Sequence, residues 1–431
     1  MAKILYAEVD FRSTRKEKFE FLAKGKNIYG LDLREIAPDK NHTWLTEGMQ
    51  NDWEESLPMG SKEGKAGISK TIFLLYSRGV ATCRDAWVYN SSSKTLKDNV
   101  NKSIEFYNEQ VFKYSRLNPK PAIDDFVTSN DSLISWSEGL KLSLGRINQF
   151  DFNKSYIRYS IYRPFYSNYL YFNKNLVERR YQQHKIFPTP DTENENLVIS
   201  LTGIGWKAPF YCLMSDKIVD IQIAGNTQCF PFYTYNEDGT GRRENITDWA
   251  LEQFRSRYGD AAITKWDIFY YIYGALHKPD YRTKYAANLR RELPRIPFYE
   301  DFRLFAEAGK KLAELHVGYE SQPEYYLQKI EAPGKQLDWR VEKMRLSKDK
   351  TMIIYNDFLT LAGIPREAFE YKLGNRSALD WIIDQYQVKT DKRSGIVNDP
   401  NRPDEPDYIV RLIGKIITVS LETMKVVKVL G

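Results

Sequence analysis

The sequence predicts an α+β fold: a small α/β segment, then a domain with a mainly antiparallel sheet, a helical bundle and a mixed C-terminal lobe. Residues 3–11 alternate like a strand, short strand-like runs punctuated by Gly, Asn and Pro fill 196–235, and helical apolar spacing dominates 246–319. A chain of 431 residues is long enough for two or three domains, each with its own core. We expect domains at 1–120, 121–330 and 331–431.

The first 120 residues are expected to form the α/β segment. The alternating run KILYAEVDF predicts a strand, and residues 13–27 predict a helix that begins at a Ser/Thr cap and ends near Gly25. Residues 71–90 add an apolar run and an aromatic strand, with a turn at Gly79 between them. These patterns predict a small unit that combines strands with a helix.

A long helix is predicted at 93–114. Its apolar residues recur every three or four positions and therefore share one face. Pro119 and Pro121 follow and end the helix, which sets the first domain boundary. The residues of this face are Leu96, Val100, Ile104, Tyr107 and Val111.

The middle domain is expected to combine a sheet with helices. The short strands of 196–235 predict an antiparallel sheet. Helices are predicted in 246–259, 264–297 and 298–319, and the last has acids at its start and Gly318 as its stop. Its apolar stripe consists of Phe302, Phe305, Leu312 and Leu315.

The last hundred residues predict a mixed lobe. Residues 350–358 are strand-like, whereas 377–387 and 406–427 have helical spacing. The longest apolar runs fall far short of the roughly 20 residues that a membrane helix needs. The N-terminus lacks a signal-peptide core, so we expect a cytoplasmic protein with no membrane partner.

Several kinds of chemistry have no sequence signal. The chain has no phosphate-binding GxxxxGK[ST] loop, no HExxH and no GxSxG motif. Its three cysteines are widely separated, which predicts neither a disulfide framework nor a zinc site. Two GxG pairs, at 203–205 and 239–241, favour turns over ligand loops, although the ligand alternative stays open. His277 and His316 favour packing, and Asp124 and Asp125 favour helix-start acids.

The strongest functional candidate is the segment 156–185, which contains seven tyrosines, six Lys or Arg and one acid. Cationic side chains neutralise phosphates, and tyrosine hydroxyls bond phosphate oxygens. The alternative is a pair of half-buried strands whose basic tips are solvated. Residues 178–185, ERRYQQHK, gather cations on a helix or turn, or form a plain solvated face. Composition does not decide between these readings, and the net charge of +6 adds little.

Four long motifs carry a resemblance: YRPFYSNYLYFNKNLVERR, SRGVATCRDAWVYN, DIFYYIYGALHKPDYRTKYAANLRRELPRIPF and RSALDWIIDQYQVKTDKRSGIVNDPN. They resemble the C-terminal region of Type ISP restriction-modification enzymes, which string a nuclease, a helicase-like motor, a coupler, an adenine-N6 methyltransferase and a target recognition domain along one chain. The methyltransferase's Asn-Pro-Pro-Tyr motif does not occur here. The resemblance therefore implies the end of the methyltransferase core followed by the recognition domain.

The resemblance favours duplex DNA as the partner, together with the methyltransferase and helicase-like domains of a parent polypeptide. It implies no catalytic and no metal-binding residue, and S-adenosylmethionine, ATP and magnesium are expected only for the full-length parent. The residues expected to contact DNA are Arg158, Tyr162, Arg163, Lys174, Arg179, Arg180, Lys185 and Lys207. Two alternatives remain: an adenine-N6 methyltransferase with an aberrant motif, and a protein-interaction module that docks on a motor domain.

Overall fold

The computed structural model describes residues 3–10, 13–38, 42, 44, 46 and 48–431. Contacts divide the chain into two compact units, one up to Asn51 and one from Asp52 to Gly431. Helices and mainly antiparallel sheets occur together, which confirms the α+β class. The boundaries expected at 120 and 330 stay predictions.

The first unit pairs two short strands and contains one helix. Strands β1 (Ile4–Tyr6) and β2 (Arg34–Ile36) are antiparallel, and α1 spans Arg15–Gly25. The Thr14 hydroxyl accepts from the Glu17 N–H at 3.3 Å, while the Glu17 carboxylate accepts from the Thr14 N–H at 2.5 Å. This reciprocal cap confirms the predicted helix start. Strand β1 is shorter than the strand predicted at 3–11, and the last residue of that prediction, Phe11, lies outside the described residues.

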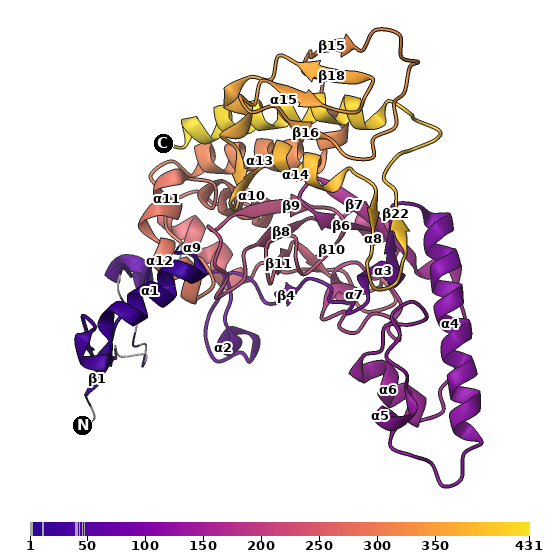
Figure 1. Ribbon diagram of the computed structural model, residues 1–431. Helices are drawn as coiled ribbons and strands as arrows, with labels where there is room; N and C mark the ends of the chain where they lie inside the picture. The colour runs from indigo at the N-terminus through magenta and orange to yellow at the C-terminus, as the bar shows by residue number, and fades with distance from the viewer. Residues whose placement is uncertain (1–2, 11–12, 39–41, 43, 45, 47) are drawn as a thin grey trace. The chain divides into compact units, whose positions relative to one another are not determined.

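The second unit contains three four-stranded sheets (Figure 1). The first has the order β10 (Ile218–Val219), β6 (Ile157–Arg163), β7 (Tyr166–Tyr171), β5 (Tyr89–Asn90). The second has the order β4 (Ser77–Arg78), β11 (Gln228–Pro231), β8 (Val198–Leu201), β9 (Cys212–Ser215). The third, in the C-terminal lobe, has the order β15 (Gln328–Glu331), β18 (Leu359–Ala362), β17 (Met352–Ile354), β16 (Arg345–Leu346).

Short strand pairs and helices complete this unit. The pairs are β3 (Leu57–Pro58) with β14 (Arg295–Ile296), β12 (Tyr233–Thr234) with β13 (Arg243–Glu244), β19 (Lys372–Leu373) with β20 (Arg376–Ser377), and β21 (Lys389–Thr390) with β22 (Val397–Asn398). The helices are α2 (Lys62–Lys65), α3 (Asp85–Val88), α4 (Ser93–Ser115), α5 (Ile123–Phe126), α6 (Glu138–Gly145), α7 (Gln183–Ile186), α8 (Pro190–Glu193), α9 (Asp248–Tyr258), α10 (Lys265–Ala275), α11 (Pro279–Lys284), α12 (Ala286–Arg291), α13 (Phe302–Val317), α14 (Ala378–Gln385) and α15 (Tyr408–Val429).

The prediction of one antiparallel sheet in 196–235 is wrong at β10. This strand leaves β9 through a tight turn, in which the Lys217 N–H donates to the Ser215 hydroxyl at 3.0 Å, and pairs in parallel with β6. Ser160 on β6 donates its hydroxyl to the Ile218 carbonyl at 2.8 Å. Because β10 is buried and covers the edge of β6, the backbone groups of that edge are satisfied by a strand that the pattern assigned elsewhere.

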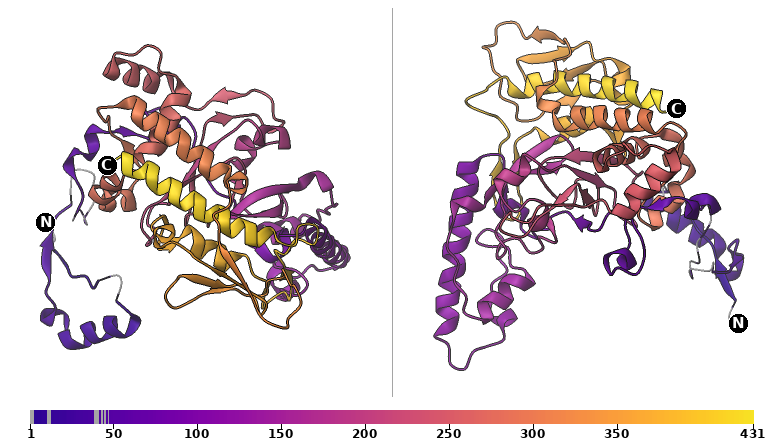
Figure 2. Two further views of the ribbon diagram at one scale, coloured as in Figure 1. Left: turned by 90° about the horizontal axis from the view of Figure 1, so that it is seen from above. Right: turned by 180° about the vertical axis from the view of Figure 1, so that it is seen from behind.

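Helix α4 confirms the long helix predicted from its apolar spacing. All five residues of the predicted face are buried, and the Ser92 hydroxyl caps the first turn by accepting from the Thr95 N–H at 3.2 Å. Figures 1 and 2 show α4 with α6 beside it. The predicted helix-start acids Asp124 and Asp125 do lie in the first turn of α5.

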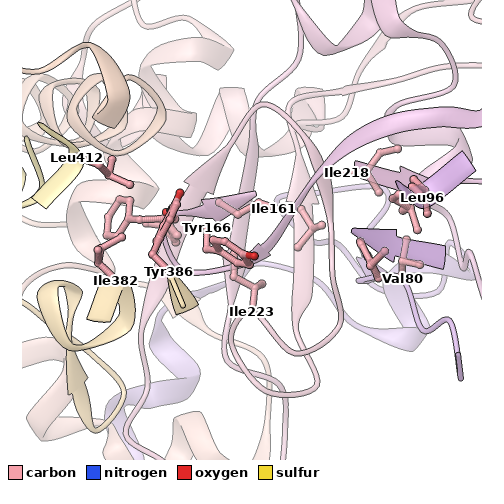
Figure 3. Packing of buried hydrophobic residues seen from close by; sticks show 14 of the residues in the cluster. Val80, Leu96, Ile161, Tyr166, Ile218, Ile223, Ile382, Tyr386 and Leu412 are labelled. Atoms are coloured by element: carbon pink, nitrogen blue, oxygen red, sulfur yellow. The ribbon is translucent and has the colours of Figure 1, made fainter. Parts of the chain in front are cut away.

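The larger hydrophobic cluster joins the first sheet to the C-terminal lobe. Figure 3 shows Ile161 of β6 and Tyr166 of β7 together with Ile382, Tyr386 and Leu412 of the lobe. The rings of Tyr166 and Tyr386 lie 4.8 Å apart in an edge-to-face arrangement. The β6–β7 hairpin is therefore anchored by residues about 220 positions later in the chain.

The second cluster packs helices on the β4-β11-β8-β9 sheet. Ile199, Met214 and Phe230 of the sheet belong to it together with Phe269 of α10 and Phe305 of α13. Helices α9, α10, α11 and α13 confirm the predicted helical region, and the left view of Figure 2 shows α15 along α13.

Two glycines allow α10 and α13 to cross closely. A Cβ at Gly309 would lie 1.8 Å from the Tyr270 carbonyl oxygen, and a Cβ at Gly274 would lie 2.4 Å from that of Phe305. Since real Cβ atoms do not approach backbone oxygens that closely, only glycine fits at either position.

Both histidines near the predicted helix ends are used inside the fold. The Tyr273 hydroxyl and His316 Nδ1 lie 2.6 Å apart, and His316 Nε2 lies 3.0 Å from the Thr423 hydroxyl. His277 Nδ1 lies 2.8 Å from the Tyr273 carbonyl oxygen. Burial lowers the pKa of both imidazoles, so they remain neutral packing groups.

No helix among the described residues is both long and apolar enough to cross a membrane.

Candidate nucleic-acid interface

The tyrosine-rich segment forms the β6–β7 hairpin and the loop that follows it. Tyr159 and Tyr169 are paired across the strands with ring centroids 4.9 Å apart, and Tyr166 and Tyr171 are buried. These side chains hold the sheet and the core together, as the strand alternative proposed. The more exposed cations lie after the hairpin, between residues 174 and 185.

A hollow of about 400 Å³ lies beside this hairpin and brings three of the predicted residues together: Arg158, Lys174 and Arg180. We call it the basic hollow. Its other walls come from the end of β7, from α7 and from the turn before α8, and they include Tyr156, Phe172, His184, Thr189 and Glu237. Positive groups, hydroxyls and aromatic rings therefore share one concave surface.

Lys174 and Arg180 supply the available positive charge of the basic hollow. Lys174 is exposed, and the Arg180 guanidinium carbon lies 5.6 Å from the centre of the Phe172 ring. Within the part of the chain that the structure describes, neither forms an ion pair with a carboxylate. Burial lowers the pKa of Arg180, but a guanidinium stays protonated in proteins. Two charges are thus free to neutralise an anion.

His184 contributes little charge at neutral pH. Its Nε2 lies 3.1 Å from a Glu237 carboxylate oxygen, which favours the charged imidazolium. Burial, followed by the nearby positive charge of Arg180, nevertheless lowers its pKa below the ordinary value. His184 and Glu237 therefore form the less basic side of the hollow.

Arg158 shapes the hollow from inside the protein. Its Nε donates to the Glu193 carboxylate at 2.8 Å, and its terminal nitrogens donate to the carbonyls of Pro188 and Phe187 at 3.1 and 3.2 Å. The side chain is only 5% exposed. Because its donors are used within the chain, Arg158 fixes the loop 187–193; its contact with DNA stays a prediction.

Tyr162 and Arg163 belong to a second, separate group of buried charges. The Tyr162 hydroxyl donates to Asp85 at 2.9 Å, and the Arg163 guanidinium donates to Asp220 at 2.8 Å. Burial raises the pKa of Asp220 to about 7, although Arg163 opposes this shift. Both residues line a hollow of about 370 Å³ with Lys389 and do not reach the basic hollow.

Arg179 lies on a neighbouring strip of surface beside β4. Its backbone exchanges hydrogen bonds with Ala81 at 2.9 and 3.0 Å, while the Gln182 N–H donates to the Ser77 hydroxyl at 2.9 Å. The side chains of Arg179 and Arg78 are exposed, and Arg78 lies 5.9 Å from the centre of the Tyr181 ring. We call Arg78, Arg179 and Tyr181 the β4 strip.

Arg78 is the residue that sequence reasoning missed. It follows the apolar run TIFLLYS and precedes Gly79. A Cβ on this glycine would lie 2.6 Å from the Asp220 carbonyl oxygen. A lone cation at the end of an apolar run was the available signal. Only the hydrogen bonds between residues 77–81 and the segment 179–183 bring Arg78 next to Tyr181.

The last two predicted residues lie elsewhere. Lys185 is half-buried in α7, where its carbonyl accepts from the Tyr235 N–H at 2.9 Å. Lys207 is exposed in the loop 202–210, which lines neither the basic hollow nor the β4 strip. The structure therefore brings Arg158, Lys174 and Arg180 to the basic hollow and places Arg179 on the β4 strip. The predicted residues outside both surfaces are Tyr162, Arg163, Lys185 and Lys207.

The described residues contain no cluster of three or more side chains suited to a metal ion.

The chain matches the Type ISP C-terminal specificity domain over residues 71–412, and it belongs to this family. A comparison with curated proteins found no match.

Solved structures, two of them of Type ISP restriction-modification enzymes, share the fold over nearly the whole chain. A nuclease-deletion mutant of LlaGI in complex with a DNA substrate mimic is 35% identical, with a TM-score of 0.85, and the match covers 99% of this chain and 39% of that one. The DrdV–DNA complex is 34% identical, with a TM-score of 0.86, over 99% of this chain and 43% of that one. The ATP-dependent enzyme LlaBIII bound to DNA is 30% identical, with a TM-score of 0.85, and the match covers 100% of this chain and 28% of that one. The chain thus spans less than half of each.

Proposed function

We propose that this chain recognises a specific duplex DNA sequence as the C-terminal part of a larger restriction-modification polypeptide. The observation that carries the proposal is the basic hollow, where Lys174 and Arg180 have no carboxylate partner among the described residues. Membership of the specificity-domain family and the DNA-bound state of the similar enzymes support it.

The basic hollow and the β4 strip supply two kinds of contact. Lys174 and Arg180 suit phosphate oxygens, which position a protein on the duplex without reading its sequence. Arg78 and Arg179 carry guanidinium groups, whose fork of donors can bind the guanine edge in the major groove. Tyr181 offers a hydroxyl for a further phosphate contact. Phosphate contacts set the affinity, and base contacts set the preferred site.

The catalytic steps belong to other parts of the parent polypeptide in this proposal. S-adenosylmethionine, ATP and magnesium would bind the methyltransferase and helicase-like domains, and this chain would hold the duplex flanking the target adenine while the base is extruded. The parent would act in the cytoplasm, where bacterial DNA lies. If the chain transferred labelled methyl groups from S-adenosylmethionine to DNA, the proposal of a non-catalytic role would fail.

The test is selection from a pool of random duplexes, followed by binding measurements on the selected site and on a scrambled duplex. We expect preference for one sequence, with affinity that falls linearly with salt on a log–log scale. Binding that shows no sequence preference in any round would overturn the recognition role.

A further inference from the structure

A second hollow of about 350 Å³ lies between the loop 202–210, helices α11 and α12, and strand β19. We call it the tryptophan hollow. The side chains that matter to its chemistry are Trp206, Phe210, Arg282, Leu289, Arg290 and Lys372. It shares no lining residue with the basic hollow. Whatever binds there therefore uses a different surface from the proposed phosphate contacts.

The GxG pair of the sequence builds the loop that presents Trp206. A Cβ at Gly203 would lie 2.1 Å from the Asn226 carbonyl oxygen, and Gly205 has a φ of 78°, with its N–H donating to the Arg290 carbonyl at 2.8 Å. Gly225 lies under the indole, because a Cβ there would come within 2.1 Å of the ring. Three glycine positions thus fix one tryptophan at the wall of the hollow while 36% of it stays exposed.

The charged side chains that line the tryptophan hollow are all positive. Arg282, Arg290 and Lys372 line it, and no acidic side chain does so among the described residues. The Arg282 guanidinium is held in place, because its Nε donates to the Leu276 carbonyl at 2.6 Å and its Nη2 lies 3.7 Å from the Cys212 sulfur. Neither contact neutralises its charge, so Arg282 presents a fixed cation.

We propose that the tryptophan hollow binds a nucleoside monophosphate, with the base against Trp206 and Phe210 and the phosphate on Arg282 and Lys372. Aromatic walls with a basic rim match a ligand that has a flat ring and an anionic group. A volume near the lower end of ligand pockets suits one nucleotide better than an extended acidic peptide. The nucleotide can be a free molecule or one unit of an unpaired DNA strand.

The test is calorimetric titration of the full chain with deoxyadenosine monophosphate, deoxyadenosine and inorganic phosphate. We expect the monophosphate to bind more tightly than either fragment. Lys372→Gln removes one charged contact on an exposed side chain and should weaken binding about tenfold. Trp206→Leu should weaken it by a similar factor, whereas Trp206→Phe keeps an aromatic ring and should weaken it less. Lys348→Gln, at an exposed lysine outside the hollow, is the matched control.

The outcomes separate the possible ligands. Single-stranded hexadeoxyadenylate is added as a competitor. If it displaces the monophosphate and binds more weakly to the same variants, the ligand is an unpaired DNA strand. If the monophosphate binds and is not displaced, the ligand is a free nucleotide. A hexaglutamate peptide that binds more tightly than the monophosphate would overturn the inference, as would monophosphate binding unchanged in both Lys372→Gln and Trp206→Leu. Duplex binding through Lys174 and Arg180 is measured separately, so its failure leaves this result intact.

Discussion

Replacing Lys174 and Arg180 with glutamine tests the proposed DNA contact directly. Glutamine keeps much of the length of each side chain and removes its charge. If each cation neutralises one phosphate, each single variant should lower the slope of log affinity against log salt by about 0.9. Between 50 and 200 mM salt, a fourfold range, that slope corresponds to a factor of about 3.5 per contact. The double variant should lose both contributions.

Stability should change far less than binding. Lys174 is exposed and unpaired among the described residues, so its replacement should alter the free energy of unfolding by no more than about 0.5 kcal/mol. Arg180 also loses its contact with the Phe172 ring, 5.6 Å away, which is worth about 0.5–1 kcal/mol. Neither change should unfold a chain whose hairpin is anchored by buried aromatic residues.

The assay is fluorescence anisotropy with a labelled duplex at four salt concentrations, alongside thermal melting of each variant. Lys348→Gln, an exposed lysine outside the basic hollow, controls for the loss of one positive charge. A phosphate contact weakens binding to all duplexes alike, whereas a base contact relaxes preference at one position and costs about 1–3 kcal/mol. If the double variant keeps both the affinity and the salt slope of the parent chain, the basic hollow is not part of the interface.

Three further changes have expected outcomes. Arg78→Gln should weaken specific binding, and if Arg78 reads a base the loss should be about 1–3 kcal/mol on the selected site and small on a scrambled one; equal loss on both duplexes would make it a phosphate contact. Asp220, whose folded pKa is about 7, holds a proton between about pH 4 and 7 that the unfolded chain has released, so stability should fall as pH rises through this window. Asp220→Asn should flatten that dependence in urea unfolding, and an unchanged slope would contradict the role of burial. Gly309→Ala should destabilise the fold by about 1–3 kcal/mol, because the new methyl group meets the Tyr270 carbonyl. Chemical denaturation measures this loss; an unchanged free energy of unfolding would show that α10 and α13 can move apart at no cost.

Sequence alone determined those elements whose side chains carry a periodic signal along the chain. The five apolar residues of α4 and the stripe of α13 recur at helical spacing, and both helices form where that spacing predicts them. Local chemistry also fixed the cap at Thr14 and the turn at Gly205, whose positive φ favours glycine. These features depend on neighbours within a few residues, so they can be read without tertiary structure.

Tertiary structure decided which predicted residues can meet a partner. Arg158 and Arg180 looked equivalent in the sequence, yet Arg158 is bound by Glu193 from another segment whereas Arg180 lines an open hollow. β10 joined β6 rather than its sequence neighbours, and Arg78 came beside the ring of Tyr181 across about 100 residues. Burial and strand pairing depend on contacts between distant segments, and a linear pattern carries no record of which segments those are.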